Sequence, residues 1–171
     1  MLQSVKALRS APELAREKLA PHLHHYLRER ILPSNWYPEE DHLALLIALT
    51  QIFPRSDVDV WELFGRTAAK HDLTSIYRST VVHRTMLGTL QALVQVFHLY
   101  HDTGRLVVSG DEHQAEMDIF DYATVSADHC RFLSGYMKEY LEMSFGQPVA
   151  IRETLCCATG ADRCRRQFKR I

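Results

Sequence analysis

The fold of this chain is decided by residues 130–168, CRFLSGYMKEYLEMSFGQPVAIRETLCCATGADRCRRQF. Residues 146–148 (Gly-Gln-Pro) separate a helix-like half from a strand-like half. Within the second half, residues 158–162 predict a turn between two cysteine-bearing arms. The stretch therefore predicts a helix followed by a hairpin. It also contains all the cysteines of the sequence: Cys130, Cys156, Cys157 and Cys164.

One carboxylate and three of these cysteines have a spacing that suits a metal site. Cys156 and Cys164 lie eight residues apart across the turn, and Glu153 precedes Cys156 by three residues. In a regular strand Glu153 and Cys156 would face opposite sides, so a β-bulge or the start of the turn must redirect one of them. Cys130 lies in the first turns of the expected helix, where the positive helix end favours a thiolate. These ligand types suit zinc; the alternative is that the cysteines fill the core beside a surface carboxylate.

Composition bounds the class of protein. The chain has 171 residues, of which 46% are hydrophobic and 24% charged, and its net charge is -1 with ten histidines counted as neutral. No global charge imbalance favours nucleic acid or an anionic membrane. The N-terminus lacks an apolar secretory segment, and the longest apolar run, residues 43–49, is too short to span a membrane. We expect a cytoplasmic protein, in which clustered cysteines more often bind metals or stay free than form disulfides.

The hydrophobic pattern changes from helical to strand-like after residue 104. Helices are expected over residues 1–31, 38–53 and 83–100, from Asp57, and from Ser126. Strands are expected over residues 105–109, 114–122, 148–155 and 163–171. This order predicts an α+β fold in which N-terminal helices pack on a four-stranded antiparallel sheet. We expect one compact domain, with a helical portion over residues 1–100 and the sheet with its helix over residues 101–171.

The cysteine and glutamate pattern resembles the zinc site of the 4-vinyl reductase domain family. Gly135 in the last helix and the G-x-x-x-C-x-x-x-F run from Gly160 to Phe168 fit this family as well. The resemblance covers about residues 105–171. Upstream, the WYP segment and the helices as far as residue 100 are similar to myxobacterial single-domain relatives of the same superfamily. That superfamily also contains the haem-NO-binding domains and the trafficking subunits of the transport protein particle (TRAPP).

The resemblance implies a structural zinc ion, because four protein ligands leave no open position for water. It leaves Cys157 as a spare thiol or a core residue. The implied ligands are Cys130, Glu153, Cys156 and Cys164.

The resemblance also implies a function. Domains of this family sense small hydrophobic molecules in bacterial regulators or occur in tetrapyrrole metabolism, and their pocket lies between the sheet and the helices. Aromatic positions of phenol sensors are Ser134 and Ile151 here, so a phenolic ligand is not implied, and an acyl chain or an occluded pocket are alternatives. The candidate pocket residues, which would otherwise be plain core, are Phe97, Met117, Ile119, Leu133, Met137 and Ile151.

Two function classes follow. The first is a zinc-stabilised sensing or regulatory module that acts through a protein partner or as a homodimer. The second is a non-catalytic adaptor or scaffold subunit of the TRAPP type with a vestigial or acyl-binding pocket. We expect no enzyme, because the sequence contains no nucleophile elbow and no P-loop.

Haem and nucleic acid are weaker alternatives. Haem would need an axial histidine on an apolar helix and a Tyr-Ser-Arg clamp. His98 lies in such a helix, but residues 76–79 (IYRS) precede that helix and lack the spaced arginine. The last strand is basic but has few interleaved aromatic residues, so a solvated outer face or a protein-docking surface is favoured over nucleic acid. The basic residues are Arg152, Arg163, Arg165, Arg166, Lys169 and Arg170.

Overall fold

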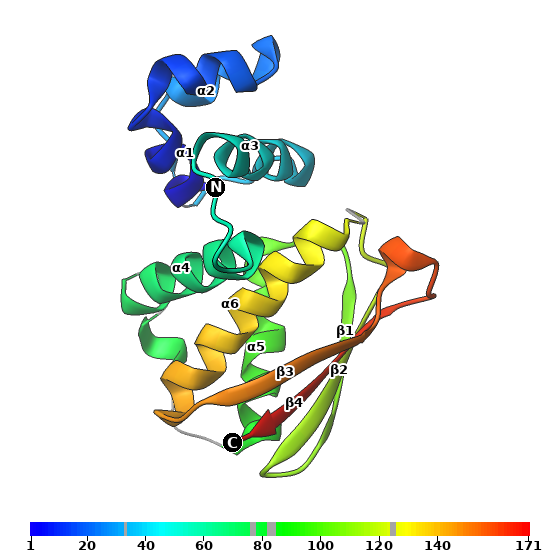
Figure 1. Cartoon of the computed structure of the whole chain (residues 1–171). Helices are drawn as coiled ribbons and strands as arrows, with labels where there is room; N and C mark the ends of the chain where they lie inside the picture. Colours follow the sequence, from blue (N-terminus) through cyan, green and yellow to red (C-terminus); the bar gives the residue numbers. More distant parts are fainter. Residues whose placement is uncertain (33, 76–77, 82–84, 124–125) are drawn as a thin grey trace. The chain divides into compact units, whose positions relative to one another are not determined.

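The computed structural model describes all residues except 33, 76–77, 82–84 and 124–125. The chain divides into two compact units, residues 1–60 and 61–171 (Figure 1). Each unit is therefore described by itself. Among the described residues, no helix combines the length and the hydrophobicity that a membrane crossing requires.

The first unit is helical. Its elements are α1 (Leu2–Arg9), α2 (Pro12–Lys18), a 3-10 helix (Pro21–Leu27) and α3 (Glu39–Ile52). α1 and α2 pack against α3 through side chains such as Leu8, Ala15 and Leu45, which are buried. The expected helix over residues 1–31 is thus broken into three short pieces. Pro12 and Pro21 each begin a piece, because proline lacks the N–H that an uninterrupted helix would use.

The second unit contains the sheet and the helices that cover it. Its helices are α4 (Val60–Thr74), α5 (Met86–Tyr100) and α6 (Ala127–Phe145), with short 3-10 helices at Arg78–Thr80 and Cys157–Thr159. Its strands are β1 (Arg105–Gly110), β2 (Gln114–Phe120), β3 (Val149–Leu155) and β4 (Cys164–Arg170). They form one antiparallel sheet in the order β1-β2-β4-β3, and α5 and α6 pack against it. The predicted α+β architecture is confirmed (Figure 1).

The two faces of the sheet differ sharply in polarity. On the face toward the helices, Met117 and Phe168 are buried in the core of the unit. The opposite face presents charged side chains, where Arg165 forms two hydrogen bonds of 2.7 Å with the carboxylate of Asp118 in the neighbouring strand. This alternation follows from the pleat, since successive side chains of a strand point to opposite faces.

α6 begins and ends as its sequence predicts. The hydroxyl of Ser126 accepts a hydrogen bond of 3.4 Å from the backbone N–H of His129, which caps the N-terminus. Gly146 ends the helix in the left-handed conformation, with φ of 65°. These caps fix the register of α6 and so determine which of its side chains face the sheet.

Two glycines allow α4 and α6 to cross in backbone contact. A Cβ atom at Gly135 would lie 2.1 Å from the carbonyl oxygen of Glu62, and one at Gly65 would lie 1.9 Å from the carbonyl oxygen of Phe132. Neither backbone can yield without moving its helix. The crossing therefore fixes α6 against α4 at its middle.

We expect Gly135→Ala to destabilise the protein by about 1–3 kcal/mol, the range for overpacking a close contact. The direction is informative, because alanine alone would favour an exposed helix over glycine by about 1 kcal/mol. Urea unfolding measures the change. Lys138→Ala on the same helix removes only a 3.2 Å ion pair with Glu62 and serves as the control. A Gly135→Ala protein as stable as the wild type would contradict the close crossing.

Candidate metal centre

Three cysteine thiols from three elements meet at one end of the sheet. Cys130 lies in the first turn of α6, Cys156 directly follows β3, and Cys164 begins β4. The sulfur of Cys130 lies 3.6 Å from that of Cys164 and 3.6 Å from that of Cys156. All three sulfurs lie within 4.8 Å of one another, and all three residues are buried. The cluster could hold a metal ion, as the sequence predicted for these residues.

The backbone between β3 and β4 brings the thiols together. The pairing of β3 with β4 shifts register between Glu153 and Leu155, so a bulge interrupts the strict alternation of side chains. This confirms the expected redirection between Glu153 and Cys156. The connection then turns through Gly160 in the left-handed region, with φ of 95°. Cys164 follows and pairs with Ile119 of β2.

A chain of hydrogen bonds favours one thiolate in the cluster. Cys156 donates to the sulfur of Cys130. The hydrogen bond from Cys130 lowers the pKa of Cys164 to about 5, and the backbone N–H of Cys157 also donates to this sulfur at 3.3 Å. The pKa of Cys130 is raised because it keeps the shared proton and is buried. The cluster thus offers one thiolate before any metal binds, and a thiolate is the form that ligates.

Glu153 lies at the edge of the cluster. Its Oε2 accepts a hydrogen bond of 3.1 Å from Nη2 of Arg166, and its side chain is 29% exposed. Burial raises the pKa of the Glu153 carboxyl, and the guanidinium of Arg166 opposes that shift. A hydrogen bond with the Cys156 thiol also acts on this carboxyl and lowers its pKa. Glu153 therefore lies near the thiols but shares its carboxylate with an arginine.

Arg166 was not expected here, because its place in a basic run predicted a solvated face or a docking surface. That assignment is wrong for Arg166, whose side chain is 0% exposed on the helix side of the sheet. The strand pattern contained the signal, since Arg166 lies between Cys164 and Phe168 at a spacing of two residues. By contrast, Arg163 and Arg165 lie on the outer face and pair with Asp118.

Cys157 is separate from the three clustered thiols, as predicted. It is half-buried and lies in the 3-10 helix after Cys156. Its backbone N–H, and not its position in a ligand set, links it to Cys164. Burial raises the pKa of the Cys157 thiol to about 11, which favours the protonated form.

The predicted pocket residues lie in the packed interior. Phe97, Met117, Ile119 and Met137 belong to one buried core cluster, and Ile151 packs against it half-buried. Leu133 is also buried. Their role as a ligand lining stays a prediction.

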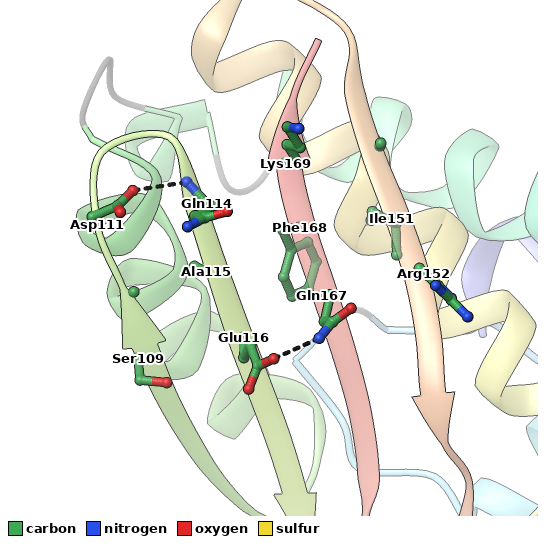
Figure 2. A pocket seen from close by; sticks show the side chains of 12 residues that line it. Ser109, Asp111, Gln114, Ala115, Glu116, Ile151, Arg152, Gln167, Phe168 and Lys169 are labelled. Carbon is green, nitrogen blue, oxygen red and sulfur yellow. Dashed lines mark hydrogen bonds between the residues drawn. The ribbon is translucent and has the colours of Figure 1, made fainter.

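A groove of about 520 Å³, which the sequence did not predict, lies on the outer face of the sheet (Figure 2). Ser109, Glu116, Gln167 and Arg152 line it from four strands, and Glu116 accepts a hydrogen bond of 2.6 Å from Gln167. The polar outer positions were visible in the sequence, but their grouping depends on the strand order.

Comparison with known proteins agrees with the resemblance seen in the sequence. Residues 120–170, which contain α6, β3 and β4, match the model of the 4-vinyl reductase domain family. The match includes all three clustered cysteines. No curated protein sequence matches the chain significantly.

The whole fold is similar to those of solved H-NOX proteins. For an H-NOX protein of T. tengcongensis the TM-score is 0.67 and the identity 15%, over 98% of this chain and 93% of that chain. For an S. oneidensis H-NOX protein in the Fe(II)NO ligation state the TM-score is 0.61 and the identity 17%, over 94% and 87%. For an oxygen-binding H-NOX domain related to soluble guanylate cyclases the values are 0.66 and 17%, over 98% and 90%. At such identities the likeness shows the fold alone.

Metal binding by the three thiols predicts different results for two neighbouring cysteines. We expect Cys164→Ser to weaken Co²⁺ binding by more than about 100-fold, the largest loss typical of a mere outer-shell change. It should also abolish the sulfur-to-metal charge-transfer absorption. Cys157→Ser is the matched control and should leave both unchanged, because its thiol is not in the cluster. Equal losses in the two variants would refute the ligand assignment.

Proposed function

We propose that this chain is a zinc-stabilised regulatory module that binds an apolar small molecule and acts through a protein partner or a second copy. The observation that carries the proposal is the buried three-cysteine cluster, which lies inside the part of the chain that matches the 4-vinyl reductase domain. The proposed role is non-catalytic. The metal holds the fold together, and the regulatory event takes place in the apolar interior beside it.

Zinc suits the cluster by chemistry and by distance. With zinc–sulfur bonds of about 2.3 Å, tetrahedral geometry separates two sulfurs by about 3.8 Å. The two 3.6 Å separations from Cys130 are close to this value. Glu153 supplies the fourth ligand in the proposal, so Cys130, Cys156, Cys164 and Glu153 complete the tetrahedron. Such a centre is structural, and its binding free energy adds to folding stability.

The ligand class follows from the fold and from the chemistry of the interior. Some proteins of similar fold bind small ligands, since two of the solved structures are an oxygen complex and an Fe(II)NO state. In this chain the predicted pocket residues are apolar, and they lie between the sheet and the helices α5 and α6. We therefore propose a small apolar ligand for this interior, with no commitment to a phenolic ring.

Haem does not fit the described residues. Two similar structures concern heme or porphyrin distortion, one of them in the H-NOX family, so a haem site was tested here. His98, the candidate axial ligand on α5, is exposed, and His101 one turn later forms a 3.1 Å hydrogen bond with Tyr122. Val81 stands two residues after Ser79, where the expected clamp needs an arginine, and Tyr77 lies outside the described residues. The proposed function contains no haem.

The adaptor alternative differs from the sensor in one measurable respect. An adaptor of the TRAPP type would use the fold for assembly, and its interior would stay closed. The burial of Met117 and Met137 suits a closed interior as well as a ligand that the side chains must part to admit. The two functions therefore separate on ligand occupancy and not on the fold.

Native mass spectrometry of gently purified protein tests the ligand. We expect a stoichiometric small-molecule adduct in addition to the mass of zinc. Met137→Trp should abolish the adduct, because it fills the predicted pocket, whereas Arg152→Met on the outer face should retain it. A tight dimer whose protomers carry no adduct would favour the adaptor.

Metal removal tests the zinc. Elemental analysis of freshly purified, reduced protein should give one zinc per chain. Zinc present at a thousandfold excess over its Kd would stabilise the fold by about 4 kcal/mol. Chelation should therefore lower Tm by about 10 °C, since about 2–4 °C corresponds to 1 kcal/mol in a chain of this size. Protein without zinc, and with a Tm that a chelator leaves unchanged, would overturn the metal part of the proposal.

A further inference from the structure

We propose that Arg166 is a positioning residue of the metal centre, which offsets the negative charge of the centre and directs the carboxylate of Glu153 toward the metal. The inference rests on the proposed zinc site and deepens it. It assigns a role to a buried arginine that neither the cysteine pattern nor the comparisons identify.

The burial of Arg166 needs an explanation. Its side chain is 0% exposed. A guanidinium loses a large hydration free energy when it is buried, and only ion pairs and hydrogen bonds offset the loss. The described structure supplies one carboxylate, Glu153, which itself is partly solvated. Among the described atoms, the buried Nη1 of Arg166 has no hydrogen-bond partner. These contacts leave the positive charge only partly compensated.

A metal centre supplies the missing negative charge. A divalent zinc ion with three thiolates and one carboxylate carries a net charge of -2. Arg166 would reduce the charge of this buried group to -1. In the metal-free protein the guanidinium already acts in this sense, because it lowers the pKa values of Cys130, Cys164 and Glu153. A residue that stabilises the anionic forms of the ligands also favours the metal that needs them.

The contacts of Arg166 reach ligands on two other elements. Its Nη2 donates to the backbone carbonyl of Cys130 at 2.8 Å and to Oε2 of Glu153 at 3.1 Å. Its Nε donates to the hydroxyl of Ser134 at 2.7 Å, which orients the guanidinium plane against α6. Cys164 lies two residues earlier on the same face of β4. One side chain thus links α6, β3 and β4 behind the thiols.

The strand pairing explains why Glu153 can serve both partners. Glu153 is paired with Arg166 across β3 and β4, immediately before the bulge that redirects the chain to Cys156. One carboxylate oxygen is held by the arginine, which leaves the other for the metal. Without Arg166, the carboxylate could turn to solvent, since it lies at the exposed edge of the cluster.

The test measures zinc affinity by chelator competition in Arg166→Met, Arg166→Lys and Glu153→Gln proteins. Loss of an outer-shell partner of a ligand typically weakens metal binding about 10–100-fold. We expect a loss near the upper end for Arg166→Met. Arg166→Lys should lose about tenfold, because lysine keeps the charge but not the planar fork. Arg152→Met is the matched control: Arg152 lies on the outer face, lines the groove there and should leave the affinity unchanged (Figure 2).

Two further measurements separate positioning from a general effect on folding. The visible spectrum of the Co²⁺ form reports the ligand set, so the Arg166→Met spectrum should shift toward that of Glu153→Gln. In the Glu153→Gln background, Arg166→Met should weaken binding several-fold less than in the wild type, because its partner is already absent. Circular dichroism at saturating zinc checks that each variant is folded.

The outcomes distinguish this inference from the proposed function. Wild-type protein that binds no zinc overturns the metal centre and the role of Arg166 together. Wild-type protein that binds zinc, with unchanged affinity and Co²⁺ spectrum in Arg166→Met, overturns the role of Arg166 alone. Fully additive losses in the double variant would overturn positioning through Glu153. Coupled losses with a shifted spectrum support the inference.

Discussion

The buried charge of Arg166 is the constraint on which the C-terminal part of the fold depends. A guanidinium without solvent contact is tolerated only where its neighbours are negative or accept hydrogen bonds. Those neighbours belong to α6 and β3, while Arg166 itself belongs to β4. Each element must reach its final position before the others are satisfied. A polar network of this kind specifies one arrangement, because a partly formed version costs more than none.

Backbone features far from any charge make that arrangement available. The bulge between Glu153 and Leu155 aims the carboxylate and the following cysteine at the same region. Without the bulge, strict alternation would send one of them to the outer face. Gly65 and Gly135 act on the opposite side of α6, where they let that helix lie in backbone contact with α4. The thiol of Cys130 thus approaches the sheet on a helix that is fixed at its cap and at its middle.

Much of this was accessible from the sequence because it is local. Alternation over residues 114–120, the Ser126 cap and the glycine at position 146 each act within a few residues, and the structure confirms them. The convergence of the cysteines was predictable because a short turn joins two of them. The buried role of Arg166 was missed because the basic run was judged by composition and not by its alternation. The contact between Gly65 and Gly135, and the groove of the outer face, depend on helix crossing and strand order, which no short stretch of sequence encodes.

The position of α6 decides how the two halves of the proposed function relate. This helix carries Cys130 at its start, Gly135 at its middle, and Met137 and Leu141 against the core beyond. The metal and the glycine crossing hold its first half, so a ligand that parts the interior displaces mainly the second half. That half leads through Gly146 into β3, with which α6 is in contact. In the proposed module the metal therefore supplies a fixed point, and the ligand moves the free end of the helix against the edge strand of the sheet.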